Sequence, residues 1–161
     1  MRRFIVAIAA VMMLAACGQN ASAPSRSDAE LDALFAQLEQ AEDASIAPSV
    51  EQAIWSRWAD SGSPTVNILL ERAAAAETAG DRDLASSYLD QASDLAPDFA
   101  EPWNQRANLA YRGEDYTGAI AAIQETLKRE PRHFGAYAGL GLIYEELGQH
   151  RAALEAFRAA L

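Results

Sequence analysis

Apolar residues recur every three or four positions over most of the chain, which predicts amphipathic helices rather than strands. Ser27 and Glu30 form an S-x-x-E capping box at the start of a first helix. A second helix starts near Pro48, with Trp55 beside its apolar stripe, and ends before Gly62. The stripe of the first helix contains Leu31, Leu34, Phe35 and Leu38, and that of the second contains Val50, Ile54 and Trp58. We therefore expect a helical hairpin over residues 28–62.

From Val66 onward the pattern repeats with a period of 34 residues, which is typical of repeat proteins. The corresponding positions are Leu69, Trp103 and Tyr137; Ala73, Ala107 and Gly141; Ala85, Ala119 and Ala153; Leu89, Ile123 and Phe157; Ala92, Thr126 and Ala160; and Pro97 and Pro131. Each unit predicts two helices, joined by turns at 79–81, 113–115 and 147–149. The units run from about 66 to 99, 100 to 133 and 134 to 161.

These residues resemble the tetratricopeptide repeat, whose pattern is W-x-x-L-G-x-x-Y, then A-x-x-x-F, a small residue and P. The best match is the last unit, with Tyr137, Leu140, Gly141, Tyr144, Ala153, Phe157 and Ala160. The middle unit departs from the pattern at Arg106 and Ala110, and the first unit keeps mostly its small residues and Pro97. The resemblance implies an all-α fold: an α-α superhelix of about three repeats over residues 63–161, preceded by the hairpin.

Small and large residues have separate roles in such a repeat. Ala107 with Ala119, and Gly141 with Ala153, are expected where two helices cross at short distance, because larger side chains would force the helices apart. Leu89, Ile123 and Phe157 would fill the space between helices. Pro97 and Pro131 would end the second helix of their units, because proline lacks an amide hydrogen and its ring clashes with the preceding turn.

A short apolar run, Phe4–Leu14, follows two arginines and precedes the only cysteine, Cys17. The run has signal-peptide length and is too short to span a bilayer as a helix. The sequence Leu14-Ala15-Ala16-Cys17 resembles the lipobox of bacterial lipoproteins. That resemblance implies cleavage after residue 16, acylation of Cys17, and a membrane anchor of three acyl chains. The alternative is an ordinary secretory peptide with an unrelated cysteine.

The residues after Cys17 indicate a flexible tether and the membrane at which the protein is expected. Residues 17–27 are small and polar, as in a flexible tether. In the lipoprotein family an Asp after the cysteine retains the protein in the inner membrane, and here that position is Gly18. We therefore expect a lipid-anchored protein of the cell envelope, at the outer membrane and facing the periplasm if the host has one.

Charge narrows the range of partners. Removing residues 1–16 takes away two arginines and no acid, so 13 basic residues fall to 11 against 23 acidic ones, a net charge of −12. This acidity argues against nucleic acid, which needs clustered basic residues. It also argues against electrostatic attraction to anionic lipid, which leaves membrane attachment to the acyl chains.

Catalytic or metal-binding groups are not evident. His133 and His150 are separated and lie in predicted turns, where histidines are usually solvated. If Cys17 is acylated, no thiol remains as a nucleophile or metal ligand. No general base accompanies a nucleophile, and no glycine-rich run could hold a phosphate. We expect no enzyme activity, no cofactor and no metal.

Binding residues are more plausible on the concave face, which the first helix of each repeat lines in this family. Asn104, Asn108 and Arg112 recur every four residues and share one stripe. The asparagines could bond an extended peptide backbone, and Arg112 could pair with a carboxylate, which loosely resembles the carboxylate clamp of peptide-binding tetratricopeptide domains. The flanking units offer Leu70 and Ala74, or Ala138 and Leu142, so the groove would be partly apolar. An ordinary polar helix face is the alternative.

The sequence stops at Leu161, inside the second helix of the last unit, with no further helix to cover Leu154 and Phe157. Because solenoids normally carry a polar cap, either the chain is a piece of a longer protein or another surface covers this end. The leading hypothesis is a non-catalytic, lipid-anchored scaffold that binds another envelope protein. The alternative is a structural lipoprotein that associates with itself through its C-terminal end.

Overall fold

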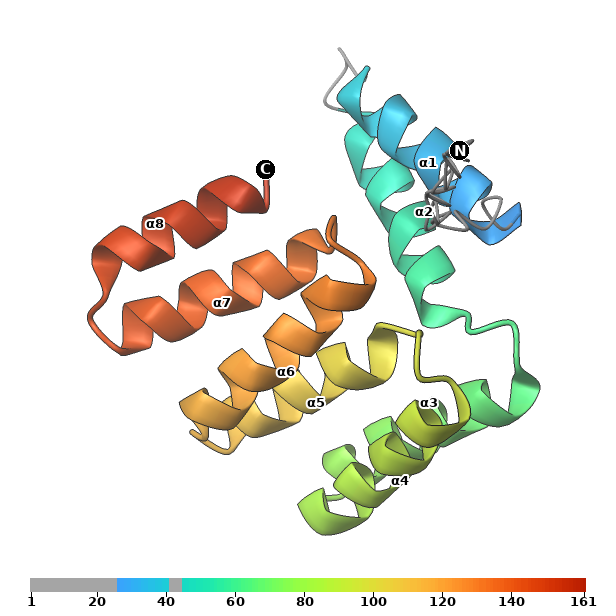
Figure 1. The fold of residues 1–161 in the computed structure, drawn as a ribbon, viewed down its shortest axis with the longest axis vertical. Coiled ribbons are helices and arrows are strands. Elements are labelled where there is room, and N and C mark those ends of the chain that lie inside the picture. The colour runs from blue at the N-terminus through green and yellow to red at the C-terminus, as the bar shows by residue number, and fades with distance from the viewer. Residues whose placement is uncertain (1–25, 41–44) are drawn as a thin grey trace, which may run out of the picture.

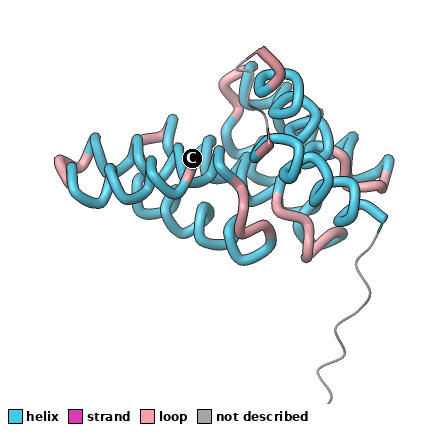
Figure 2. The backbone as a smooth tube through the Cα atoms, turned by 90° about the horizontal axis from the view of Figure 1, so that it is seen from above, coloured by secondary structure: helices cyan, strands magenta, loops and turns pink. Residues whose placement is uncertain are grey.

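The computed structural model describes residues 26–40 and 45–161, and every regular element there is an α-helix (Figure 1 and Figure 2). The bounds are α1 Arg26–Glu39, α2 Ala47–Ala59, α3 Pro64–Thr78, α4 Arg82–Leu95, α5 Glu101–Arg112, α6 Tyr116–Arg129, α7 Phe134–Glu146 and α8 His150–Ala159. The predicted all-helical class is confirmed. Cys17 and the proposed signal peptide lie outside the described residues. Helix α1 begins at Arg26, one residue ahead of the predicted cap, which is within the usual uncertainty of helix ends.

Three helix pairs, α3 with α4, α5 with α6 and α7 with α8, stack side by side as an array (Figure 1). The predicted turns at 79–81, 113–115 and 147–149 separate the two helices of each pair. Asp81 and Asp115 cap α4 and α6, because their side chains accept hydrogen bonds from the amides of Leu84 at 3.0 Å and Gly118 at 2.9 Å. Helices α4 and α6 end just before Pro97 and Pro131, as predicted.

The predicted small residues lie at the crossings of the paired helices. Ala119 and Ala153 are fully buried, and Ala107 is nearly so. A Cβ atom added to Gly141 would lie 2.5 Å from Cε1 of Phe157, which is closer than real carbon contacts allow. The ring of Phe157 therefore occupies the space that a side chain at position 141 would need. This contact brings α7 and α8 together.

The N-terminal hairpin, α1 with α2, does not continue the stack. Each later helix packs along the next one, whereas α2 and α3 do not pack side by side. Figure 1 shows the hairpin lying next to the turn between α6 and α7 instead. Val50, Ile54 and Trp58 are buried in it, together with Leu31 of α1. The hairpin is thus a separate unit that folds back onto the middle of the array.

Four aromatic rings, Trp55, Trp58, His133 and Phe134, join the hairpin to the array; we call this group the aromatic junction. The indole of Trp58 stacks on His133 with ring centroids 4.0 Å apart and planes 9° apart. Trp55 meets Phe134 edge-on at 5.2 Å. Such pairs contribute about 0.5–1.5 kcal/mol each beyond the burial of their area. A Cβ atom at Gly135 would lie 2.3 Å from Cη2 of Trp55, so this position accommodates the indole.

The prediction that His133 is solvated is wrong, whereas His150 is exposed as predicted. His133 has no exposed surface, and its Nδ1 accepts a hydrogen bond from the amide of Ala136 at 3.1 Å. The imidazole thus caps the N-terminus of α7 while it stacks on Trp58. The local sequence, a histidine after a proline turn, gave no sign of the hairpin that covers it.

Arg132 adds a polar link beside the aromatic junction. Its Nη1 lies 2.6 Å from Oδ1 of Asp32 in α1, and its guanidinium lies 4.5 Å from the ring centroid of Phe35. Burial lowers the pKa of Arg132, but hydrogen bonds to Asp32 and Glu130 outweigh burial and hold the pKa above its usual value. Because both partners are partly solvated, the ion pair contributes at most about 1 kcal/mol. It orients the hairpin more than it stabilises it.

Large apolar side chains remain exposed on α7 and α8. Leu142, Leu147 and Leu154 are 49%, 43% and 50% exposed. Leu154 is thus uncovered as predicted, while Phe157 is half-buried against Gly141. Among the helices of residues 26–40 and 45–161, none has the length and apolarity needed to cross a bilayer.

Replacing Gly141 with leucine should destabilise the chain by about 1–3 kcal/mol, because the new side chain must displace the ring of Phe157. The control is Gly139→Ala on the same helix, where the added Cβ would lie 3.7 Å from Cδ1 of Ile123, an ordinary contact. We expect Gly139→Ala to be neutral or stabilising, because alanine favours helix. Urea unfolding followed by circular dichroism measures both, and equal stabilities would contradict the packing.

Substitution of His133 separates its two roles. His133→Ala removes both the stack on Trp58 and the helix cap, whereas His133→Asn keeps a capping side chain. We expect both variants to be less stable than the natural chain. The free energy of unfolding should be about 1 kcal/mol lower for His133→Ala than for His133→Asn. Urea unfolding followed by tryptophan fluorescence gives the difference. Two variants as stable as the natural chain would show that the junction is absent in solution.

Candidate binding groove

A cavity of about 240 Å³ opens between α5 and α7; we call it the inner groove. Its lining residues are Asn104, Ala107, Asn108, Tyr111, Arg112, Ile123, Gly135, Ala136, Gly139, Leu142 and Ile143. Most come from the first helices of two neighbouring units. Ala107 of α5 and Gly135, Ala136 and Gly139 of α7 are small, which leaves space between the two helices.

The three residues predicted to share a stripe, Asn104, Asn108 and Arg112, all line the inner groove. They differ in exposure. Asn104 is only 7% exposed, and its amide nitrogen donates to Oε2 of Glu101 at 3.1 Å. Asn108 is exposed and reaches the groove one turn later. Of the two asparagines, Asn108 is therefore the one placed to meet a partner.

Arg112 is already paired within the chain. Its Nη1 lies 2.8 Å from Oε1 of Glu77 in α3, as an ion pair without hydrogen-bond alignment. Its main-chain oxygen accepts a hydrogen bond from Nη2 of Arg82 at 2.7 Å. A partner's carboxylate would have to replace Glu77 to pair with this guanidinium. Glu77 lies on α3 and Arg112 on α5, so the periodicity of one helix could not reveal this ion pair.

Of the two leucines predicted to make the groove partly apolar, Leu70 and Leu142, only one lines it. Leu70 is 5% exposed and belongs to the core of the first unit, so it does not line the groove. Leu142 does line it and is half exposed. Gly135 and Gly139 also line the groove, although no role was predicted for them. Their spacing of four on one helix was the available signal, since it places two side-chain-free positions on one face.

Metal-binding and acid–base groups are sparse near the groove. Within residues 26–40 and 45–161, no group of three or more His, Cys, Asp or Glu side chains is arranged to hold a metal ion. His133 is buried against Trp58, and His150 does not line the groove; its Nδ1 lies 3.6 Å from Oε1 of Glu145. What the inner groove offers is an amide, a paired arginine and an apolar wall, which suit binding.

Comparison with known proteins identifies the repeats. Residues 104–161 match the tetratricopeptide repeat family. A TPR repeat-containing protein of Rhizobium etli is 36% identical over 143 residues, which cover 89% of this chain and 70% of that protein. The chain belongs to the tetratricopeptide repeat family. The family match begins inside α5 and leaves out α3 and α4, whose motif is the most degraded.

Other similarities are more distant. Protein bimA of Emericella nidulans is 30% identical over 80 residues, 50% of this chain and 10% of that protein. The crystal structure of MamA superimposes with a TM-score of 0.57 at 19% identity, covering 81% of this chain and 75% of MamA. A point mutant of MamA superimposes with a TM-score of 0.52 at 16% identity, covering 83% of this chain and 94% of the mutant chain. These structures support the tetratricopeptide fold, and the family makes a protein-interaction scaffold the expected class.

Proposed function

We propose that this tetratricopeptide protein is a lipid-anchored scaffold of the bacterial cell envelope, which binds an extended segment of another envelope protein in the inner groove. The observation that supports this most directly is the composition of the groove, where Asn108 and Leu142 stand on facing helices, α5 and α7. An asparagine side chain both donates to and accepts from a peptide backbone. Leucine beside it gives an apolar side chain a place to pack.

The inner groove is smaller than a typical pocket for a drug-sized ligand. Pockets for drug-sized ligands usually measure about 300–1,000 Å³ and enclose most of the ligand. The inner groove, at about 240 Å³, is smaller and suits one or two side chains of a longer segment. The remaining contacts of such a segment would lie along neighbouring units, as stacked repeats provide extended surfaces.

The membrane part of the proposal rests on the sequence Leu14-Ala15-Ala16-Cys17. Acylation at Cys17 would hold the repeats at the bilayer surface through the tether of residues 17–27. The acidity of the chain supports a lipid anchor rather than a basic surface as the means of attachment. Gly18, in place of the aspartate of inner-membrane lipoproteins, supports the outer membrane in a host that has one.

Photo-crosslinkers at Asn108 and Leu142 should capture the same partner in living cells, because both positions face the groove. The control is Gln124, which is exposed on α6 and does not line the groove. Mass spectrometry of the crosslinked bands identifies the partner. Equal capture from all three positions would contradict the groove, and capture of a second copy of this chain would support self-association instead.

Changing Cys17 to alanine should remove the acyl chains and move the protein from the membrane fraction to the soluble fraction. Metabolic labelling with a fatty-acid analogue and fractionation measure this directly. Gly18→Asp serves as a matched variant: it should keep the label and, in a host with two membranes, move the protein to the inner one. A Cys17→Ala variant that stays in the membrane would contradict the anchor.

A further inference from the structure

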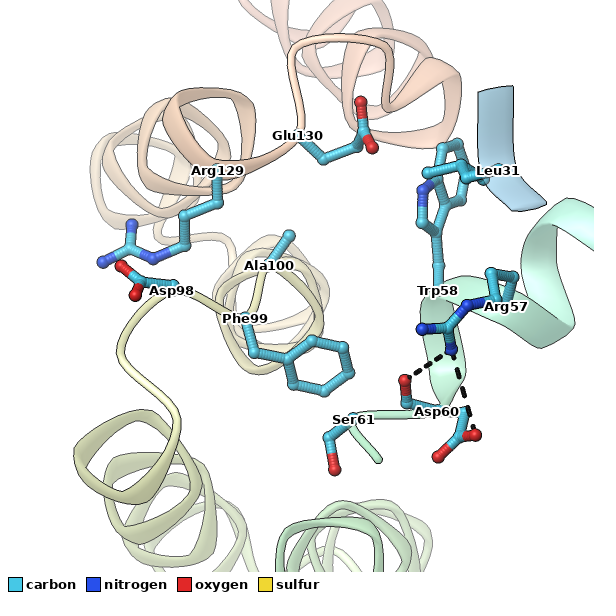
Figure 3. A pocket seen from close by; sticks show the side chains of 10 residues that line it. All are labelled: Leu31, Arg57, Trp58, Asp60, Ser61, Asp98, Phe99, Ala100, Arg129 and Glu130. Atoms are coloured by element: carbon cyan, nitrogen blue, oxygen red, sulfur yellow. Dashed lines mark hydrogen bonds and ion pairs between the residues drawn. The ribbon is translucent and has the colours of Figure 1, made fainter. Parts of the chain in front are cut away.

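A second cavity, of about 180 Å³, lies where the hairpin meets the array; we call it the junction cavity (Figure 3). Its walls come from α1, the end of α2 and the turns that precede α5 and α7. It shares no lining residue with the inner groove. A single water molecule needs only about 10–15 Å³, so this space can hold a small organic molecule.

Two buried N–H groups on α2 face this region without a partner. Trp58 is 6% exposed, and its Nε1 has no hydrogen-bond partner among the described residues. The same holds for Nε of Arg57, whose Nη1 donates to the main-chain oxygen of Asp60 at 3.0 Å. Figure 3 shows the indole nitrogen of Trp58 directed into the cavity. A buried donor without an acceptor is energetically unfavourable. A ligand whose oxygen atoms accept hydrogen bonds from these N–H groups would remove that cost.

Two carboxylates line the cavity: Asp60, whose Oδ2 lies 3.9 Å from Nη1 of Arg57, and Glu130. Oε1 of Glu130 accepts hydrogen bonds from the amide of Arg132 at 2.9 Å and from its Nε at 3.2 Å. These bonds leave Oε2 for a ligand. In Figure 3 the carboxylate of Glu130 points toward Trp58. The cavity lining therefore contains both a buried hydrogen-bond donor and a negatively charged acceptor.

The other charged groups of the lining are engaged or directed elsewhere. Arg129 donates to the main-chain oxygen of Pro97 and to Glu125. Asp60 accepts hydrogen bonds from Asn67 and the amide of Gly62, which hold its pKa below the usual value. The side chain of Asp98 turns away from the cavity in Figure 3. What remains for a ligand is Trp58, Arg57 and Glu130.

We propose that the junction cavity binds a free α-amino acid with an apolar side chain. Its carboxylate would accept from Nε1 of Trp58 and Nε of Arg57, and its ammonium group would donate to Oε2 of Glu130. An α-amino acid carries both groups on one carbon, which matches a single cavity lined by both donors and an acceptor. An uncharged amide has the same hydrogen-bonding pattern but would forgo the stronger bonds between charged groups.

The apolar residues of the lining favour an apolar side chain on the bound amino acid. Leu31, Phe99 and Ala100 line the cavity and contribute hydrocarbon surface. A leucine-sized side chain would pack there. Because the ligand would contact the hairpin and the array together, its binding would stabilise the docked hairpin. This site is independent of the proposed scaffold function, since no residue of the inner groove takes part.

Titration of the full chain in detergent micelles with L-leucine tests the proposal. The chain has three tryptophans, so the ¹⁵N spectrum contains three indole signals. We expect the Trp58 signal, assigned with Trp58→Phe, to shift and saturate. Trp58→Phe should weaken binding about tenfold, as the loss of one charge-assisted hydrogen bond predicts. The matched control is Trp103→Phe, whose Nε1 is also buried without a partner but lies outside the cavity; it should bind normally.

Chemical variants of the probe separate the two charges. L-leucine methyl ester lacks the carboxylate and N-acetyl-L-leucine lacks the ammonium group, so each should bind about tenfold more weakly or worse. Glu130→Gln should weaken the binding of L-leucine and leave that of N-acetyl-L-leucine unchanged. The Trp55 signal, which reports contact with Phe134, verifies that each variant keeps the hairpin docked.

Two results would overturn the proposal. Equal binding of L-leucine and both derivatives would show that charge does not determine recognition. No movement of the Trp58 signal at millimolar L-leucine, with the hairpin docked, would show that the cavity holds only solvent. Because capture at Asn108 does not depend on this cavity, either result leaves the scaffold function standing.

Discussion

The structure depends on the close approach of paired helices at residues with one side-chain carbon or none. Ala119 and Ala153 have no exposed surface. The ring of Phe157 occupies the space that a side chain at Gly141 would need. Each contact of this kind is small, but it recurs in every unit and fixes how far the two helices stand apart. The first helices of two such pairs, α5 and α7, provide most of the residues that line the inner groove.

The hairpin is held by a different kind of packing. Its contact with the array consists of large rings, Trp58 on His133 and Trp55 on Phe134, instead of small residues between parallel helices. Large flat groups do not fill an irregular junction completely. The regular stack leaves the inner groove between α5 and α7, and the junction leaves a cavity lined by buried N–H groups. The two spaces differ in chemistry because they arise from these two kinds of packing.

The few basic residues of this acidic chain are largely used within it. The pairs between elements are Arg106 with Asp90, Arg112 with Glu77, and Arg132 with Asp32. Each of these ion pairs connects two neighbouring units, or connects the hairpin to the array. The inner groove is left with the amide of Asn108, the paired guanidinium of Arg112 and apolar carbon as its accessible chemistry. These groups can bond the backbone of a partner and pack against its apolar side chains.

The sequence alone determined the helices, their turns and the small residues at their crossings. These features rest on spacings of three, four and 34 positions, and such spacings are visible along the chain. It also placed Asn104, Asn108 and Arg112 on one stripe. Only the tertiary structure decided that Glu77 pairs with Arg112 and that Asn104 is buried. It alone showed that the hairpin folds back to cover His133 and create the junction cavity. These contacts join residues far apart in the chain, and a periodic pattern encodes which face of a helix is apolar but not which distant surface will cover it.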